Sequence, residues 1–218
     1  MNEYKISQKL NSDKTDIMGK NNYLISEVLL PLVETTGGLE ILFEVRSKHL
    51  SRQPGEICFP GGRVEEDELG RPGSAAQREA AEELGLPTDD ITLLGSLDVL
   101  VTPMGALVYP FAGRILSPGS IVLNRGEVDK IFTVPLAFLQ SNRPQVSNVE
   151  VATRYGDDFP LHRVPEIYRG GWTKRWSFPT YIYEYKDYFI WGMTAIILHH
   201  FLTAIGKEQS QIFLNPRT

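Results

Sequence analysis

Residues 61–86 read GGRVEEDELGRPGSAAQREAAEELGL, and this stretch decides which fold and chemistry we expect of the chain. Two glycines lead into an acidic loop, and the alanine- and glutamate-rich run after it predicts a helix over Ser74–Leu84. Ser74 and Gln77 have the spacing of a capping box at the start of this helix. Gly85 follows as an ordinary helix stop.

Three carboxylates share one face of the predicted helix. Glu79, Glu82 and Glu83 are spaced i, i+3 and i+4, which places them within one turn of each other. Residues 62–86 hold seven acidic and three basic side chains, so they carry −4 of the chain's formal charge of −5. A hard divalent cation with oxygen ligands, Mg²⁺ or Mn²⁺, would offset this charge. An ordinary solvated acidic face is the alternative for three glutamates taken alone.

The frame around these glutamates resembles the signature of the Nudix hydrolases, Gly-x5-Glu-x7-Arg-Glu-U-x-Glu-Glu-x-Gly-U, where U is aliphatic. The second half is complete from Arg78 to Leu86. The first half matches at Gly62 and Glu68, but nine residues instead of seven separate Glu68 from Arg78. The two extra residues fall in the turn at 69–74, where glycines and a proline could accommodate them.

The resemblance implies an α/β protein, a Nudix α/β/α sandwich with a mixed β-sheet, and metal ions that activate water against a diphosphate. By position, Glu82 and Glu83 would bind the metal, and Glu79 would be a ligand or assist the base. The carbonyl of Gly61 would complete a coordination shell. Arg78 would orient Glu79 or Glu82, as charged partners of metal ligands often do.

A further glutamate from a later loop is common in this family. Glu127 lies in the expected sequence context, ahead of the apolar run 131–136. A loop acid without a ligand role is the alternative for this residue.

A basic cluster precedes the two glycines. Residues 42–62 read LFEVRSKHLSRQPGEICFPGG and resemble the extra motif of the coenzyme A pyrophosphatases within the Nudix family, as does the aromatic stretch 181–202. A 3′-phosphorylated ADP group needs cations for its phosphates. A solvated basic cluster at the end of a strand is the alternative. The residues that would bind substrate are Arg46, Ser47, Lys48, Arg52 and Gly55.

The remaining chain shows alternating strand and helix patterns. A helix or turn is expected at 128–140, and a buried helix at 191–205. We expect one Nudix domain at 23–218, after an N-terminal arm or short helix at 1–22. Apolar runs predict strands at 23–34, 39–47, 56–59, 91–101, 107–115 and 181–190.

The composition excludes several classes of protein. The 218 residues are 42% hydrophobic and 22% charged, which is typical of a globular protein. With 22 basic and 27 acidic side chains the chain lacks the excess of cations that nucleic-acid binders need. The single cysteine, Cys58, excludes an intramolecular disulfide and a cysteine-based zinc site. We expect a cytoplasmic protein without signal peptide or membrane helix, and a homodimer is compatible with the sequence.

The expected reaction is metal-dependent hydrolysis of a nucleoside diphosphate derivative. The resemblance implies coenzyme A or acyl-CoA as substrate, giving 4′-phosphopantetheine and adenosine 3′,5′-bisphosphate. ADP-ribose or another nucleoside diphosphate derivative is the alternative substrate. A Nudix-fold binding or regulatory module without turnover is the alternative of another class, which missing carboxylates would have favoured.

Overall fold

The computed structural model describes residues 2–10 and 17–206, and their strands form one large and one small sheet. The large sheet has the order β3-β2-β1-β7-β5, with β4 paired to β1, β6 to β7 and β8 to β2. β1 and β7 run parallel, whereas the other pairs are antiparallel, so the expected mixed sheet is confirmed. The strands are β1 (Leu24–Thr35), β2 (Gly38–Arg46), β3 (Ile57–Cys58), β4 (Gly61–Arg63), β5 (Ile91–Ser96), β6 (Leu100–Val101), β7 (Ala106–Ile115) and β8 (Val128–Pro135).

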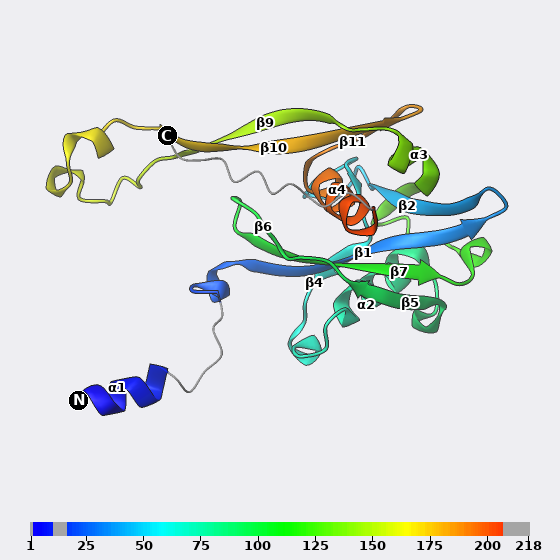
Figure 1. The fold of residues 1–218 in the computed structure, drawn as a ribbon, viewed down its shortest axis with the longest axis horizontal. Helices are drawn as coiled ribbons and strands as arrows, with labels where there is room; N and C mark the ends of the chain where they lie inside the picture. The colour runs from blue at the N-terminus through cyan, green and yellow to red at the C-terminus, as the bar shows by residue number, and fades with distance from the viewer. Residues whose placement is uncertain (1, 11–16, 207–218) are drawn as a thin grey trace.

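Helices cover both faces of the large sheet (Figure 1). Side chains alternate between the two faces of a strand. On β1, Leu29 packs with the alanines of α2 (Ser74–Leu84), whereas Leu30 and Leu32 pack with α4 (Gly192–Ile205). The α/β/α arrangement is therefore confirmed, and α2 has the bounds that the sequence predicts.

The segment 128–140 differs from its prediction. It contains the strand β8, followed by the short helix α3 (Leu136–Ser141). The strand was missed because only Val128 and Val134 of β8 are buried, so its sequence shows no clear alternation. Pairing with β2 along most of its length fixes the strand, and this tertiary contact outweighs local propensity.

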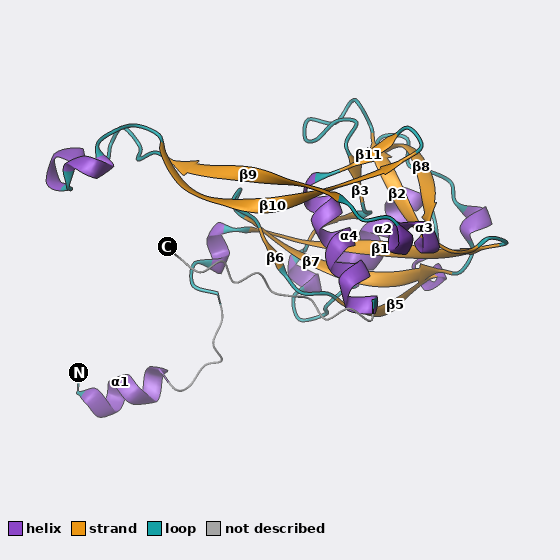
Figure 2. Ribbon diagram, turned by 45° about the horizontal axis from the view of Figure 1, so that its top comes forward, coloured by secondary structure: helices purple, strands orange, loops and turns teal. Residues whose placement is uncertain are grey.

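The small sheet is a long hairpin with a third strand at its inner end (Figure 2). It consists of β9 (Gln145–Thr153), β10 (Thr173–Tyr185) and β11 (Tyr188–Ile190). The strand predicted at 181–190 is divided between β10 and β11. β9 and the start of β10 escaped prediction because nearly all their side chains are exposed. At the inner end, Tyr183 and Ile190 join the core that α4 covers.

The remaining helices are short. The N-terminal segment 1–22 contains the helix α1 (Glu3–Leu10), and residues 1 and 11–16 of that segment lie outside the described part. None of the helices within the described ranges is long and apolar enough to cross a membrane. The 3₁₀ helices are η1 (Lys20–Asn22), η2 (Glu66–Glu68), η3 (Thr88–Asp90), η4 (Pro118–Ser120), η5 (Leu161–Arg163) and η6 (Glu166–Tyr168).

Candidate active site

Helix α2 begins at Ser74, but the predicted capping box is wrong. Gly73 is the N-cap residue, and the Ser74 hydroxyl donates a hydrogen bond of 2.7 Å to the carbonyl of Arg71. The Gln77 side chain donates to the carbonyl of Ile91 instead of returning to the helix start. The orphan N–H groups of the first turn therefore need another acceptor.

That acceptor is Glu27, which reaches the helix from β1. Its buried carboxylate accepts hydrogen bonds from the backbone N–H groups of Gly73, Ala75 and Ala76, at 3.1, 3.0 and 3.3 Å. A carboxylate at a helix N-terminus also interacts favourably with the helix dipole. Sequence reasoning missed this residue, although an acid beside an otherwise apolar strand segment was a signal. Glu27 anchors the helix on which the signature carboxylates lie.

The two glycines of β4 allow this strand to lie against β1 and α2. A Cβ added to Gly61 would lie 2.5 Å from the carbonyl oxygen of Glu27, and one on Gly62 would lie 2.2 Å from Cδ of Glu79. At Gly61, where the obstacle is backbone, only glycine permits such close approach. The N–H of Gly61 donates a hydrogen bond of 3.0 Å to Oε2 of Glu83, so this loop fixes one of the signature carboxylates.

Arg78 lies among the glutamates of the signature. Its Nη1 donates to Oε1 of Glu79 at 2.8 Å and lies 3.7 Å from Oε2 of Glu82. Its Nε and Nη2 donate to the two oxygens of Glu68, at 2.8 and 3.2 Å. The structure thus places Arg78 next to Glu79 and Glu82, the residues that the sequence predicts it to orient. The orienting role itself stays a prediction.

The two extra residues after Glu68 do not separate it from Arg78. The Glu68 side chain is only 5% exposed, and it also accepts a hydrogen bond from the N–H of Glu65. The turn that follows contains Gly70 and Gly73, whose φ angles of 86° and 87° favour glycine. Hydrogen bonding to Arg78 is the main cause that lowers the pKa of Glu68.

The other signature carboxylates differ in burial. Glu83 is buried, and burial, together with repulsion by Glu79 and Glu127, raises its pKa to about 8 despite the Gly61 N–H. Burial also raises the pKa of Glu79, which Arg78 partly offsets. Glu82 is the accessible member, with a side chain that is 58% exposed. Glu127, predicted from a later loop, thus lies within electrostatic range of Glu79 and Glu83.

The loop that carries Glu127 is joined to the end of β2. The N–H of Ser47 donates a hydrogen bond of 2.7 Å to the Glu127 carbonyl. At the same strand end, the N–H of Gly55 donates to the Arg46 carbonyl, and Nε of Arg46 lies 3.5 Å from the carbonyl oxygen of Arg52. Arg46, Arg52 and Gly55 are therefore brought together next to the acidic loop.

The predicted substrate residues differ in accessibility. Lys48 and Arg52 are exposed, whereas Ser47 is buried and its hydroxyl oxygen accepts a hydrogen bond from the N–H of His49. The charge of Arg46 attracts the buried carboxylate of Glu83. Of this set, Lys48 and Arg52 are thus the cations that solvent reaches most readily.

The acidic residues are chemically suited to a divalent metal ion. As they lie in the described ranges, no three acidic, histidine or cysteine side chains form a group that could hold a metal ion. One observation nevertheless fits a cation: Oε1 of Glu44 is buried beside Glu83 and has no hydrogen-bond partner. Uncompensated buried carboxylates are costly, and an all-oxygen donor set suits hard cations.

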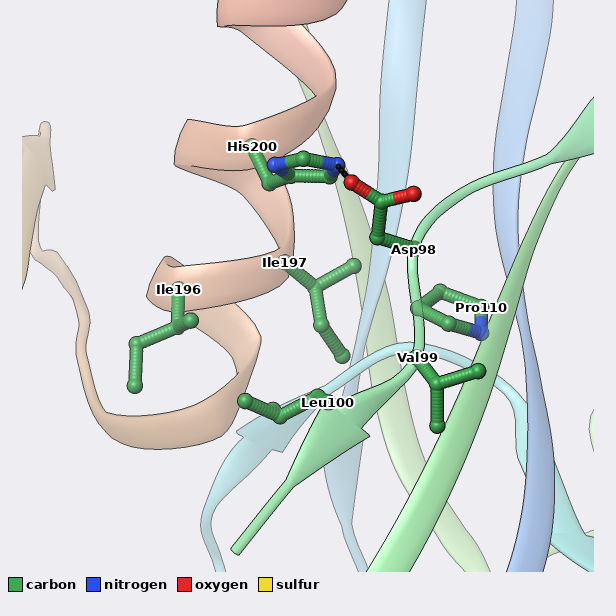
Figure 3. A pocket seen from close by; sticks show the side chains of 7 residues that line it. All are labelled: Asp98, Val99, Leu100, Pro110, Ile196, Ile197 and His200. Atoms are coloured by element: carbon green, nitrogen blue, oxygen red, sulfur yellow. Dashed lines mark ion pairs between the residues drawn. The ribbon is translucent and has the colours of Figure 1, made fainter. Parts of the chain in front are cut away.

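A small cavity lies elsewhere, on the side of the sheet that α4 covers (Figure 3). In it, Nε2 of His200 lies 3.2 Å from Oδ2 of Asp98. No carboxylate of the signature lines this cavity, so it is separate from the site on α2. Its lining residues are Asp98, Val99, Leu100, Pro110, Ile196, Ile197 and His200.

Part of the sequence matches a known protein family. Residues 27–149 match the family model of the NUDIX domain, whose members generally use divalent metal ions. The chain is 34% identical over 212 residues to the mouse peroxisomal coenzyme A diphosphatase NUDT7, covering 92% of this chain and 79% of the mouse protein. It is 36% identical over 128 residues to the peroxisomal coenzyme A diphosphatase ndx-8 of Caenorhabditis elegans, covering 57% and 55%.

Among solved structures, the Nudix hydrolase RenU of M. smegmatis superposes with a TM-score of 0.45 at 23% identity, covering 55% of this chain and 74% of that one. The family match spans more than half of this chain, and the similarity to the mouse protein extends over nearly all of it. The chain therefore belongs to the Nudix hydrolase family.

Proposed function

We propose that the protein hydrolyses the diphosphate of coenzyme A or acyl-CoA. Water oxygen forms a bond to one phosphorus and the bridging P–O bond breaks, giving 4′-phosphopantetheine, or its acylated form, and adenosine 3′,5′-bisphosphate. The observation that carries the proposal is the 34% identity to a coenzyme A diphosphatase over 92% of this chain. Two contacts on α2 support it: Arg78 hydrogen-bonds to the carboxylate of Glu79, and the Gly61 N–H hydrogen-bonds to that of Glu83.

The chemistry assigns distinct roles to these residues. Mg²⁺ or Mn²⁺ supplies charge neutralisation at the diphosphate and lowers the pKa of water. Glu82 and Glu83 would hold the metal, together with the Gly61 carbonyl, and Glu79 and Glu127 would complete the acidic set. Glu79 is the candidate to accept the proton of water, and Arg78 orients its carboxylate through the hydrogen bond of 2.8 Å.

The cations at the end of β2 are proposed to select the substrate. Arg46, Lys48 and Arg52 would bind the phosphates of the 3′-phosphorylated ADP group. Ser47 and Gly55, in the same segment after β2, would hold these cations in place. Coenzyme A should then be cleaved faster than dephospho-CoA, which lacks the 3′-phosphate. Equal rates on coenzyme A, dephospho-CoA and ADP-ribose would contradict this selection.

The first experiment is product analysis by mass spectrometry. Purified protein is incubated with coenzyme A, with Mg²⁺, with Mn²⁺ and with a chelator. We expect both products only when a metal is present, and the relative rates decide between the two ions. Cleavage of ADP-ribose but not of coenzyme A would keep the Nudix reaction and overturn the substrate. No cleavage of any diphosphate would favour a binding module without turnover.

Location, assembly and domain organisation complete the proposal. We propose a cytoplasmic homodimer that binds small molecules and not nucleic acid. Its residues 23–218, of which 207–218 lie outside the described part, would form one domain after an arm at 1–22. The core shared by β1, β2, β10 and α4 supports one domain. Light scattering tests the dimer, and a gel-shift assay tests nucleic-acid binding. Because two relatives are named peroxisomal, imaging of the tagged protein decides between the two locations.

A further inference from the structure

Glu44 lies beneath the candidate site, although it is outside the signature. Side chains alternate along β2, so Glu44 shares a face with Leu42. Leu42 packs with Leu84 of α2. The alternation therefore directs Glu44 towards the same helix, and its carboxylate makes a hydrogen-bonding contact with that of Glu83.

The surroundings of Glu44 leave part of its carboxylate unsatisfied. The residue is 1% exposed, and its Oε1 has no hydrogen-bond partner. Two carboxylates in contact share a proton, so that only one is charged, unless a cation beside them allows both to be charged. Arg46 attracts Glu44 electrostatically but does not hydrogen-bond to Oε1.

Glu27 shows what a purely structural buried glutamate looks like in this fold. It lies on the same side of the sheet, and both of its oxygens accept hydrogen bonds from backbone N–H groups. Buried polar groups without partners are rare and call for an explanation. Glu44 instead has two acidic neighbours, Glu83 and Glu127. A divalent cation would stabilise such a group of carboxylates.

We propose that Glu44 is a further carboxylate of the metal centre, which contributes from β2 to cation binding together with Glu83. This inference rests on the proposed metal-dependent function. It enlarges the acidic set beyond the residues that the signature implies, to a residue of β2 that lies 18 positions before Gly62, the first residue of the signature.

The test is Mn²⁺ binding to the Glu44→Gln variant, measured by calorimetry and by electron paramagnetic resonance without substrate. Glutamine resembles the protonated acid in shape, so the metal-free variant should unfold at the same temperature as wild type or higher. Mn²⁺ binding should weaken about 10–100-fold, and the rise in melting temperature on adding Mn²⁺ should shrink accordingly. Glu40→Gln is the matched control, because Glu40 lies on the same face of β2 and hydrogen-bonds to Thr133. It should bind Mn²⁺ like wild type.

The outcomes separate this inference from the proposed function. Equal Mn²⁺ affinity in wild type and Glu44→Gln would overturn the inference and leave Glu44 as an acid that shares a proton with Glu83. No Mn²⁺ binding by wild type would overturn the metal centre itself. If Glu44→Gln does not fold, Glu44→Asp serves instead: it keeps the charge but shortens the side chain, and unchanged affinity in that variant would also overturn the inference.

Discussion

The two ends of helix α2 rest on the sheet through buried glutamates that have opposite surroundings. At the N-terminal end, Glu27 accepts hydrogen bonds from three backbone N–H groups and ties the helix to β1. At the C-terminal end, Glu83 contacts Glu44, and one oxygen of Glu44 has no partner. The first arrangement is complete within the protein, whereas the second crowds two carboxylates together and leaves one oxygen without a partner.

This difference indicates that the two ends of α2 have different roles: the N-terminal end stabilises the fold, and the C-terminal end serves the reaction. A group whose hydrogen bonds are all satisfied stabilises the fold, and removing it leaves buried donors unpaired. Crowded carboxylates cost stability, and natural proteins often accept such local conflicts at functional sites. Substitutions at the N-terminal end should therefore affect unfolding, and those at the C-terminal end should affect turnover.

The largest expected effect is on turnover, in Glu82→Gln. We expect kcat on coenzyme A to fall about 10³-fold, because the loss of one charge weakens both metal binding and the charge stabilisation of the reaction. The melting temperature should hardly change, since the Glu82 side chain is 58% exposed and packs in no core. Steady-state kinetics and a thermal melt check both parts. Glu184→Gln, on an exposed position of β10, is the control and should behave as wild type. Wild-type turnover of Glu82→Gln at saturating Mg²⁺ would remove Glu82 from the metal ligands.

Glu27→Ala should have the converse effect. Three N–H groups at the start of α2 would lose a charged acceptor, which we expect to lower the free energy of unfolding by about 3 kcal/mol. For a chain of this size the melting temperature should fall by roughly 6–12 °C. Glu34→Ala, at the exposed end of the same strand, should change it far less. A stable Glu27→Ala variant with impaired turnover would reverse the assignment of the two ends.

The signature helix is the part of the fold that the sequence predicts best. Its bounds, Ser74–Leu84, follow from local information: an alanine row that faces the sheet and Gly85 as the stop. The hairpin of β1 and β2 is equally local. β9 could not be predicted in the same way, because a strand exposed along most of its length has no buried face to produce a period of two.

The residues of the site also differ in how well the sequence predicts their contacts. Spacing along the sequence is enough to predict the contacts of Arg78 with Glu79 and Glu82, because these residues share one helix. Glu27 and Glu44 are acids that lie among apolar residues of β1 and β2, and nothing local shows which helix covers them. The cap also illustrates this limit: Ser74 and Gln77 fit a capping box, but a carboxylate 46 positions before Gly73 takes the role.

Gly62→Ala tests how closely β4 must approach the helix. The new methyl group would lie 2.2 Å from Cδ of Glu79, so the carboxylate must turn away from Arg78. Because the obstacle is the end of a flexible side chain, we expect the fold to persist. We expect kcat to fall about tenfold, since misplacing a reacting group by about 1 Å can lower the rate even more. Gly95→Ala, where an added Cβ meets open space, is the control. Unchanged kinetics in Gly62→Ala would show that the position of Glu79 does not limit the reaction.

Glu68→Gln should give the smallest effect, and one that depends on pH. The hydrogen bonds from Arg78 lower the pKa of Glu68 in the folded protein. Its stabilising contribution is therefore present above the pKa of an unfolded glutamate, about 4.3, and is lost as the pH falls through the lower folded value. We expect the variant to be less stable than wild type by about 1 kcal/mol at pH 7, and the difference to shrink at pH 3. Urea unfolding at both pH values measures it. A difference that stays constant would mean that the carboxylate charge is not what ties the loop to Arg78, and the loop–helix contact would then rest on packing alone.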